Sequence, residues 1–574
     1  MKKVCHNPSL SATMIENDAP PQAPSASAVV INYHDFIDGG KNGGDHVAEP
    51  SISVSTTIPV TSPATNRPVL TFTASNRERV DLAISTAYNA FHARDVSKES
   101  WSHPSQVSSR IIVLNEIARL LRQNTQRLAD LEVKQIGRPK KEMRFQLSRL
   151  PEWFEYFASL LRVHEDSVKP FGPGYLNVVK RVPLGVIAQI TPFNHPLLIT
   201  IKKLAPAIAA GNTVVVKPSE FAPASIIELA KLCSEAGLPN GVFNVVLGGP
   251  DVAQQLISDK RIVKVDFTGG PKIGKIIGAA AGANLCLTTQ ELGGKAPMVV
   301  LAPPGLGCDS AGTTTYDDVA LRHYLNPIVN GLAFGAFIAS GQTCIAGTRI
   351  IAHESIYEML KAELVSKTKV FKMGDPDDLA TTIGPIITVK QFEFITRTVE
   401  EGLKDPNLEL LCGGKRYTGF QSGHLKDGNY FEPTIIAAKS ELSEQDMLTL
   451  HQANVLFQTE LFGPVVLLIP FRTKQEAIAL ANDTPYGLGC SIWTNDIVEA
   501  HTFADSIHSG IVWINDHHKN GPASPWGGLT KDSGIGRENG IEAYHEYTQT
   551  KSIVINSANR FTSDWFQDPN ARYN

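Results

Sequence analysis

The sequence contains no long hydrophobic segment. The best candidate for a membrane span, residues 327–340, includes Asn330 and two glycines and is shorter than the roughly 18 to 20 apolar residues that cross a bilayer. At the N-terminus, Lys2 and Lys3 are followed by no apolar run, unlike a secretory signal. We therefore expect no membrane span, and we expect the cytoplasm as the compartment.

Paired cysteines and an excess of charge of either sign are also missing. Seven cysteines are spread along the chain without CxxC spacing, so we expect neither a disulfide framework nor a zinc site, and no catalytic metal. Lys and Arg total 53 against 57 Asp and Glu, a formal net charge of -4. This balance supplies no field that would gather phosphate backbones, so nucleic acid is not an expected partner.

What is present is a long chain with a core-forming composition. Its 574 residues are 42% hydrophobic and 19% charged, enough to bury cores in several folding units of roughly 150 residues. Residues 1–30 differ because Pro, Ser and Ala dominate there, and such a composition cannot bury a core. We predict a disordered tail for this segment.

The middle of the chain alternates between strand and helix patterns. Between residues 184 and 301, short β-branched runs are separated by stretches with helical spacing, which predicts parallel βαβ units. A second series of the same kind runs from about residue 349 to 514. The predicted fold class is therefore α/β, with two lobes.

Three polar residues follow strand ends or turns that could aim them into a cleft. Cys344 ends a GQTC motif after an apolar segment, Glu291 begins an ELGGK motif, and Asn194 lies between two prolines. A thiol, a carboxylate and a fixed amide are the groups that nucleophilic catalysis at a carbonyl needs. Taken singly, each also has an ordinary alternative: a packed cysteine, a solvated loop carboxylate and a turn asparagine.

Two further segments have the pattern of a nucleotide site. Lys217 and Glu220 follow the carboxyl end of a predicted strand, where α/β sheets bind ligands. Residues 267–274 read as a strand, a glycine turn and a helix start, a geometry that suits a phosphate. The segment is not a GxGxxG motif, so on its own it is a weak indication.

In combination these motifs resemble the aldehyde dehydrogenase superfamily of non-phosphorylating, NAD(P)-dependent enzymes. The resemblance extends over about residues 34–557, with the motifs in the family's order. They are PFN at Pro192–Asn194, KPSE at Lys217–Glu220, FTGG at Phe267–Gly270, ELGGK at Glu291–Lys295, GQTC at Gly341–Cys344, ELFGPV at Glu460–Val465, and the PWGG and SGIGRE pair within Pro525–Glu538.

The resemblance implies NAD-dependent oxidation of an aldehyde to the carboxylic acid. Cys344 would attack as a thiolate and form a thiohemiacetal and then a thioester, Glu291 would activate the hydrolytic water, and Asn194 would stabilise the oxyanion. Two alternatives stay open: an acylating enzyme that passes the thioester to coenzyme A, and a non-enzymatic protein that binds aldehyde or coenzyme.

The resemblance also assigns coenzyme contacts. A carboxylate such as Glu220 accepts hydrogen bonds from a free 2′-hydroxyl and repels a 2′-phosphate, which favours NAD over NADP. The full set of implied cofactor residues is Lys217, Ser219, Glu220, Gly269, Gly270, Pro271, Lys272, Ile273, Gly274, Leu292, Glu460 and Phe462.

The implied architecture is a Rossmann-like coenzyme domain, an α/β catalytic domain and a small β oligomerisation arm. We place the NAD-binding domain at 31–165 and 184–295, the catalytic domain at 296–530, and the arm at 166–183 and 545–557. A strand edge exposed on the arm would seek a partner, so a homodimer or homotetramer is expected. The chain departs from the family pattern at Pro303–Tyr324, which widens the interval before Cys344 and is predicted to be a surface insertion.

The predicted aldehyde pocket is lined by Phe193, His195, Lys202, Ile345, His518 and Trp526. Trp526 resembles a residue of the betaine and aminoaldehyde branch of the family, in which aromatic rings hold a substrate cation. His195 and Lys202, however, stand where that branch places aromatic residues. We therefore predict an uncharged aromatic or aliphatic aldehyde first, and a semialdehyde with its carboxylate near Lys202 second. The alternative for Lys202 is a solvated helix face shared with Lys203.

Overall fold

The structure is a computed structural model that describes residues 31–40, 56–92, 100–303, 318–557, 566–567 and 569. The predicted tail, residues 1–30, lies outside the described residues, and so does the central part of the predicted insertion. The end of that insertion, residues 318–324, is not a loop but the start of a long helix, because its apolar positions continue the helical spacing of the segment that follows.

The first lobe is built on a six-stranded sheet in the order β18-β10-β9-β6-β7-β8. All neighbouring pairs are parallel except β18 with β10. The strands are β6 (Val186–Ile190), β7 (Thr213–Lys217), β8 (Phe243–Val245), β9 (Ile262–Thr268), β10 (Leu287–Glu291) and β18 (Gly534–Ile535). A separate three-stranded sheet contains β1 (Asn32–Tyr33), β2 (Thr57–Ser62) and β3 (Arg67–Thr73).

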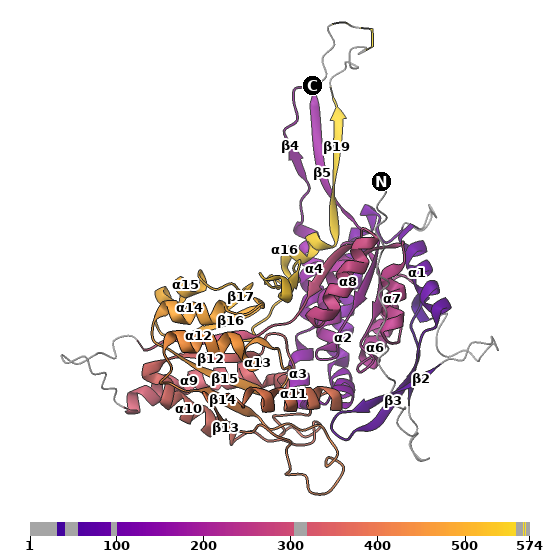
Figure 1. The fold of residues 1–574 in the computed structure, drawn as a ribbon. Helices are drawn as coiled ribbons and strands as arrows, with labels where there is room; N and C mark the ends of the chain where they lie inside the picture. Colours follow the sequence, from indigo (N-terminus) through magenta and orange to yellow (C-terminus); the bar gives the residue numbers. More distant parts are fainter. Residues whose placement is uncertain are drawn as a thin grey trace, which may run out of the picture.

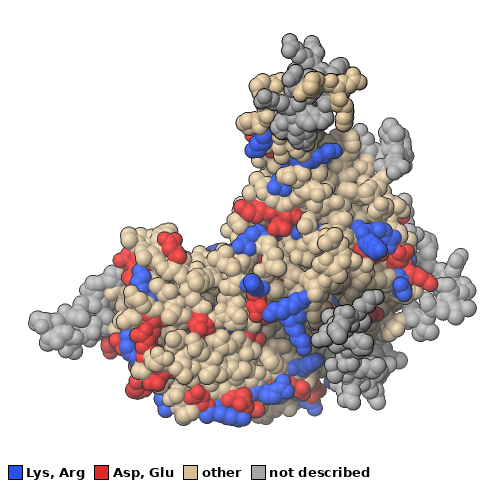
Figure 2. All heavy atoms as spheres, turned by 45° about the horizontal axis from the view of Figure 1, so that its top comes forward, with Lys and Arg blue, Asp and Glu red and all other residues tan. Residues whose placement is uncertain are grey.

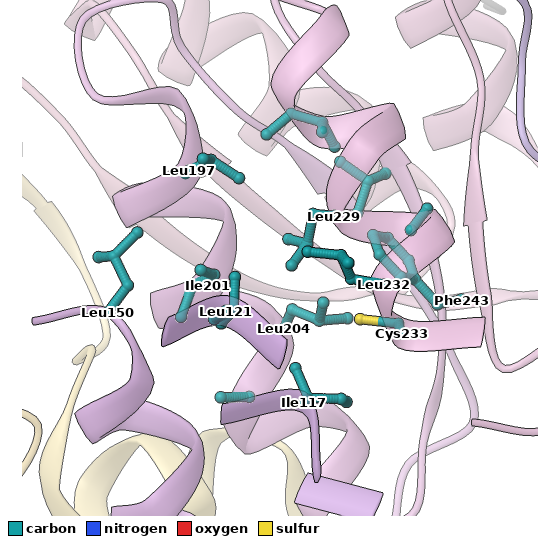
Figure 3. Close-up of a cluster of buried hydrophobic side chains, with 14 of the residues drawn as sticks. Ile117, Leu121, Leu150, Leu197, Ile201, Leu204, Leu229, Leu232, Cys233 and Phe243 are labelled. Atoms are coloured by element: carbon teal, nitrogen blue, oxygen red, sulfur yellow. The ribbon is translucent and has the colours of Figure 1, made fainter. Parts of the chain in front are cut away.

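Eight helices accompany these strands in the part of the chain that the structure describes. They are α1 (Arg77–His92), α2 (Val107–Ile136), α3 (Lys140–Ser148), α4 (Pro151–Val163), α5 (Pro196–Ala209), α6 (Ala224–Glu235), α7 (Pro250–Ser258) and α8 (Pro271–Ala283). Apolar side chains of α2, α5 and α6 meet in the core shown in Figure 3, where Ile117, Leu204 and Leu229 are fully buried. This packing holds α5, whose first turn follows Asn194, in a fixed position.

The second lobe is built on a seven-stranded sheet in the order β13-β14-β15-β12-β11-β16-β17, parallel except for β13. Its strands are β11 (Ala296–Val300), β12 (Gly347–His353), β13 (Leu408–Cys412), β14 (Thr434–Ala438), β15 (Val465–Phe471), β16 (Gly489–Trp493) and β17 (Ile511–Ile514). Its helices are α9 (Asp318–Phe337), α10 (Glu354–Thr368), α11 (Val389–Gly402), α12 (Glu444–Ala453), α13 (Val455–Gln458), α14 (Lys474–Asn482) and α15 (Ile497–Ala504).

A three-stranded antiparallel arm projects from the two lobes, at the top of Figure 1. It contains β4 (Ser167–Lys169), β5 (Tyr175–Pro183) and β19 (Thr548–Asn556), and the short helix α16 (Gly540–Glu546) leads into it. The mixed α/β architecture with two parallel sheets confirms the predicted fold class. The exact domain boundaries stay a prediction.

Two general features of the surface and the helices bear on function. Lys and Arg are interspersed with Asp and Glu over the face in Figure 2. Among the described residues, no helix is both long and apolar enough to cross a membrane.

Candidate active site

A pocket of about 830 Å³ lies between the two lobes. Side chains from α3 and α5 form one wall, and side chains from α9 and from the loops after β17 form the other. Cys344 and Glu291 both line this pocket, although they lie on different lobes. The sequence prediction that these two residues meet in one cleft therefore agrees with the geometry.

Cys344 is presented by a turn with an unusual backbone. After α9 the chain forms a short 3-10 turn, Ile338–Gly341, in which Ala339, Ser340 and Gly341 have φ of 55°, 54° and 72°. Such left-handed conformations cost energy for residues other than glycine and persist only when the surroundings hold them. Nothing in the composition of the segment predicts this run of positive φ values.

The surroundings hold this turn through several hydrogen bonds. The Ser340 hydroxyl donates to the Gly384 carbonyl at 2.9 Å and accepts from the Gly384 N–H at 3.0 Å. The Gln342 side chain accepts from the Ile387 N–H at 2.9 Å and donates to the Pro385 carbonyl at 3.1 Å. These hydrogen bonds to residues 384–387 fix the turn that precedes Cys344, and the position of the thiol is fixed with it.

The thiol of Cys344 is neutral in this environment. Burial raises its pKa above the ordinary value, the nearby carboxylates Glu460 and Glu291 raise it further, and only Lys202 acts in the opposite direction. A base must remove the thiol proton before the sulfur can attack.

Glu291 is the carboxylate in a position to accept protons in this pocket. It ends β10, and both of its carboxyl oxygens are buried with no hydrogen-bond partner among the residues that the structure describes. Burial, together with the negative charge of Glu538, raises its pKa to about 8. A carboxylate with a pKa near neutrality can exchange protons at the pH where the protein works.

Asn194 contacts the same turn from the other lobe. Its side-chain amide donates to the Gln342 carbonyl at 3.0 Å, while its Oδ1 atom is buried without a partner. The amide nitrogen carries two hydrogens, so one donor stays available beside the Cys344 segment. This arrangement can stabilise negative charge that develops on a carbonyl oxygen bound at Cys344.

A buried charge cluster lies behind Glu291. Lys202 Nζ is 2.6 Å from Glu538 Oε2, and Lys203 Nζ is 2.6 Å from Glu538 Oε1 and also pairs with Asp266. The two lysines lower the pKa of Glu538 to about 2 against the opposing effect of burial. The solvated helix face considered for Lys202 and Lys203 is wrong, because both side chains are buried.

Most of the predicted substrate residues line the pocket, but one does not. His195, Lys202, Ile345, His518 and Trp526 all contribute to its wall. Phe193 is the exception, and its placement in the pocket was wrong. Its ring packs edge to face against Phe221 and Phe462, at centroid distances of 6.1 and 5.9 Å, and this aromatic cluster holds it outside the lining.

Sequence reasoning missed a polar group around the start of α3. Arg138 forms an ion pair with Glu142 at 2.9 Å, and its Nη1 atom lies 2.7 Å from Nδ1 of His195. Gln146 joins the group through Arg138 and His195. The i, i+4 spacing of Arg138 and Glu142 was the only available signal, and that spacing usually marks a solvated helix face.

The implied coenzyme residues gather at the carboxyl edge of the six-stranded sheet. Between β6 and β9 the strand order reverses direction, which is where open α/β sheets bind nucleotides. Gly270 caps the N-terminus of α8, and a Cβ at Gly270 would meet nothing within 4 Å, so the helix end is open to a ligand. Gly269, Pro271, Lys272, Ile273 and Gly274 form the rest of this turn and the first helical residues.

The remaining coenzyme candidates lie on either side of this crevice. Lys217 ends β7 and is buried, with its Nζ atom 3.7 Å from the carboxylate of the half-exposed Glu220. Glu460 accepts from the Gly294 N–H at 3.0 Å, and burial raises its pKa to about 7. Phe462 has a φ of 51° and borders the aromatic cluster of Phe193. Ser219 and Leu292 are both buried; Ser219 lies between Lys217 and Glu220 in the sequence, and Leu292 directly follows Glu291.

These residues fit a dinucleotide. An open helix N-terminus suits a pyrophosphate, and a lysine with a carboxylate at a strand end suits ribose hydroxyls. Among the described residues, no cluster of His, Cys, Asp and Glu could hold a metal ion.

Comparisons with known proteins agree with this geometry. The model of the aldehyde dehydrogenase family matches residues 51–309 and 319–553, on both sides of the predicted insertion. The chain is 35% identical to the betaine aldehyde dehydrogenase of Bacillus subtilis over 87% of this chain and 94% of that protein. It is also 35% identical to the phenylacetaldehyde dehydrogenase of Pseudomonas fluorescens, over 87% of this chain and 92% of that protein.

A solved structure extends the comparison to the coenzyme. The betaine aldehyde dehydrogenase of Staphylococcus aureus in complex with NAD+ superposes with a TM-score of 0.81 at 30% identity, covering 93% of this chain and 96% of that one. The NAD+ in that complex supports NAD binding. The chain is an oxidoreductase that belongs to the aldehyde dehydrogenase family.

Proposed function

We propose that the protein oxidises an aldehyde to the carboxylic acid with NAD as the oxidant, through a covalent intermediate on Cys344. The observation that carries this proposal is the pairing of Cys344 and Glu291 in one pocket, with both Glu291 oxygens buried and free of hydrogen bonds. A carboxylate without structural partners, beside a thiol on a strained turn, is an arrangement that serves chemistry better than stability.

In the first step the sulfur forms a bond to the aldehyde carbon. Glu291 takes the thiol proton as a base, the carbonyl π electrons move to oxygen, and the resulting oxyanion accepts hydrogen bonds from the Asn194 amide and from backbone N–H. When bound, NAD+ accepts the hydride that leaves the former carbonyl carbon. The acyl group then stays on Cys344 as a thioester.

In the second step water releases the acid. Glu291, after passing the thiol proton to solvent, removes a proton from the water, and the water oxygen bonds to the thioester carbon as the carbon–sulfur bond breaks. The proton now on Glu291 returns to the leaving sulfur, which restores the thiol and the ionised carboxylate as the acid departs. The buried cluster of Lys202, Lys203 and Glu538 lies behind Glu291. The charge of Glu538 raises the pKa of Glu291, and the charges of the two lysines lower it. An acylating enzyme would not need this base, so the position of Glu291 supports hydrolysis over transfer to coenzyme A.

Coenzyme binding is assigned to the crevice at the end of the six-stranded sheet. Gly269 to Gly274 would hold the pyrophosphate, Lys217, Ser219 and Glu220 the adenosine ribose, and Leu292, Glu460 and Phe462 the nicotinamide half. Glu220 carries a negative charge where a 2′-phosphate would lie, which favours NAD over NADP. The ratio of kcat/KM with NAD to that with NADP measures this preference, and a ratio below one would contradict it.

We further propose that the aldehyde carries no positive charge. Lys202 Nζ lies 4.3 Å above the ring of Trp526, so the protein's own ammonium occupies the face that would bind a substrate cation. A trimethylammonium group in this pocket would meet a like charge. A substrate carboxylate is also disfavoured at Lys202, because Glu538 already neutralises it.

The proposal extends to the assembly and the compartment. The arm ends in an edge strand, which supports a homodimer or homotetramer. The described cysteines, Cys233, Cys286, Cys344, Cys412 and Cys490, are all free thiols, in keeping with the cytoplasm as the compartment.

The experiment that tests the proposal measures NADH formation by purified protein with aldehydes, with and without coenzyme A. We expect activity without coenzyme A, and we expect Cys344→Ala to remove it while Cys412→Ala, a thiol outside the pocket, retains it. Persistent aldehyde oxidation by Cys344→Ala would refute the covalent mechanism, and acyl-CoA as the main product would refute hydrolysis.

A further inference from the structure

Two histidines in the pocket wall have no part in the proposed chemistry. His195 is the N-cap of α5, directly after Asn194, and His518 lies in the loop after β17. Both rings line the pocket and are partly exposed to it. They come from different lobes, and their hydrogen-bond partners determine which nitrogen of each ring carries a proton.

His195 is held as the tautomer with its proton on Nε2. Nδ1 lies 2.7 Å from Nη1 of Arg138, and an arginine can only donate, so Nδ1 must accept. The side chain of Gln146 accepts from Arg138 through Oε1 at 3.2 Å, and its amide nitrogen lies 2.9 Å from the same Nδ1, nearer than its oxygen at 3.3 Å, so the amide is a second donor. Burial and the charge of Arg138 keep the pKa of the ring well below its ordinary value, so the ring is neutral.

His518 has the opposite arrangement. Its Nε2 atom lies 3.1 Å from the Gly335 carbonyl, which can only accept, so Nε2 carries the proton and Nδ1 is a bare acceptor. Burial, with the neighbouring His517, keeps the pKa of this ring well below its ordinary value. Among the described residues, no protein group hydrogen-bonds Nε2 of His195 or Nδ1 of His518. The pocket therefore offers one N–H donor and one nitrogen acceptor.

We propose that this pair selects aromatic aldehydes that carry a hydroxyl group on the ring. A hydroxyl can accept from Nε2–H of His195 and donate to Nδ1 of His518 at once, whereas a methoxy oxygen or a carboxylate can satisfy only His195. The aromatic side chains Phe334, Phe337 and Trp526 in the same pocket favour an aryl body over a short alkyl chain.

The other charged groups of the pocket leave the hydroxyl as the best match. Arg138, Arg149 and Lys202 each have a carboxylate partner, namely Glu142, Glu152 and Glu538. Two more lysines line the pocket, but Lys141 is exposed and Lys367 is half-buried, so no fully buried cation in the described wall is left for a substrate anion. This inference rests on the proposed function and adds the class of its substrate.

The experiment compares kcat/KM for benzaldehyde with its three hydroxy isomers and with the matching methoxy and carboxy compounds. We expect at least one hydroxy isomer to exceed benzaldehyde by about tenfold, and to exceed its methoxy and carboxy analogues. His195→Phe and His518→Phe should each bring this ratio close to one, and reading a ratio cancels any general loss of activity. The control His501→Phe, an exposed position on α15, should keep the ratio.

A second measurement separates this inference from the proposed function. Binding of the same aldehydes to the Cys344→Ala protein, followed by tryptophan fluorescence, needs no turnover. A hydroxy isomer that binds with a lower Kd than benzaldehyde, and loses this advantage in a protein that also carries His195→Phe, supports the selection. This holds even if no aldehyde is oxidised by the unmodified protein. Absence of oxidation would overturn the proposed function but not the selection. Equal kcat/KM and equal Kd for benzaldehyde and all three hydroxy isomers, or a preference that survives both histidine substitutions, would overturn the selection.

Discussion

The surroundings of Glu291 destabilise its ionised form. Both carboxyl oxygens are buried without partners, and the neighbouring Glu538 opposes ionisation, so its pKa lies near 8 instead of near 4.5. The same environment that destabilises the carboxylate makes it a strong base once it has lost its proton. Activity and stability therefore depend on this residue in opposite ways.

The first prediction concerns the rate. Activity of the unmodified protein should rise with pH through about 8, because only the ionised Glu291 can accept protons. Glu291→Gln should slow both the first release of NADH and the steady state by about a hundredfold or more, because it removes the base that serves the thiol and the water. Stopped-flow absorbance measures both phases. A Gln variant with the pH profile and steady-state rate of the unmodified protein would exclude Glu291 as the base.

The second prediction concerns stability and follows by linkage. Because the folded pKa of Glu291 is raised, the folded state retains a proton between about pH 4.5 and 8 that the unfolded state has lost. The contribution of Glu291 to stability therefore falls with rising pH in that window, by up to about 1.4 kcal/mol per pH unit. Urea denaturation measures this effect: the free energy of unfolding of Glu291→Gln, relative to that of the unmodified protein, should be higher at pH 8 than at pH 5. Parallel behaviour of the two proteins would contradict the buried, unpaired carboxylate.

The third prediction concerns Glu538, whose folded pKa is lowered to about 2. Its stabilising contribution is complete above about pH 4.5 and is lost as the pH falls toward 2. Glu538→Gln leaves Lys202 and Lys203 buried with weaker compensation and should cost about 3 to 5 kcal/mol. Chemical denaturation at pH 7 measures this loss, and the acid sensitivity of the variant should be smaller. Unchanged stability would mean that the cluster is solvated.

At the scale of the elements, the turn between α9 and β12 decides where the nucleophile lies. Three successive residues with positive φ reverse the chain, and the Gly341 position approaches the backbone of Gly463 so closely that a Cβ would lie 2.2 Å from its carbonyl oxygen. Glycine is required at this point for both reasons. The loops around residues 384–387 and 463 therefore hold the Cys344 turn in its conformation.

The fourth prediction tests this turn. Gly341→Ala must displace the Gly463 backbone and should reduce kcat by at least about tenfold, with a loss of stability of about 1 kcal/mol or more. Gly282→Ala is a matched control in α8, where a Cβ meets nothing within 4 Å and alanine should be neutral or slightly stabilising. Thermal unfolding and steady-state kinetics check both variants. Full activity in Gly341→Ala would show that the turn is pliable.

The strands and the reactive residues could be predicted from the sequence to different degrees. Strands such as β7 and β9 follow from β-branched runs, and the meeting of Cys344 with Glu291 follows from the order of motifs. The positive φ of Ala339 and Ser340 could not be predicted, because neither residue type favours it and only tertiary contacts impose it. The pairing of Lys203 with Glu538 was equally hidden, since 335 residues separate them.

At the scale of the whole molecule, the pocket exists only because two lobes and the end of the chain meet. The first lobe supplies His195 and Glu291, the second supplies Cys344, and Glu538 comes from the segment just before the arm. The arm extends away from both lobes and presents β19 as an edge strand, with Val554 and Ile555 exposed (Figure 1). An exposed apolar edge of this length is a surface that pairs with another chain.

The fifth prediction tests the arm. Replacing Val554 by Lys and Ile555 by Glu in one variant places charges on this edge strand and should shift the protein from an oligomer toward a monomer. Light scattering after size-exclusion chromatography measures the mass. Val498→Lys, at an exposed apolar position on α15, is the control and should leave the mass unchanged. An unchanged mass of the arm variant would place the subunit contact elsewhere.

The late position of Glu538 has a consequence for synthesis. Lys202 and Lys203 are translated more than three hundred residues before Glu538, so on the ribosome Lys203 can pair only with Asp266 at first, and Lys202 waits for Glu538. Strand β18, which completes the first sheet beside Glu291, emerges equally late. The surroundings of Glu291 are therefore completed only after residues 534–538 have been synthesised, well after Cys344.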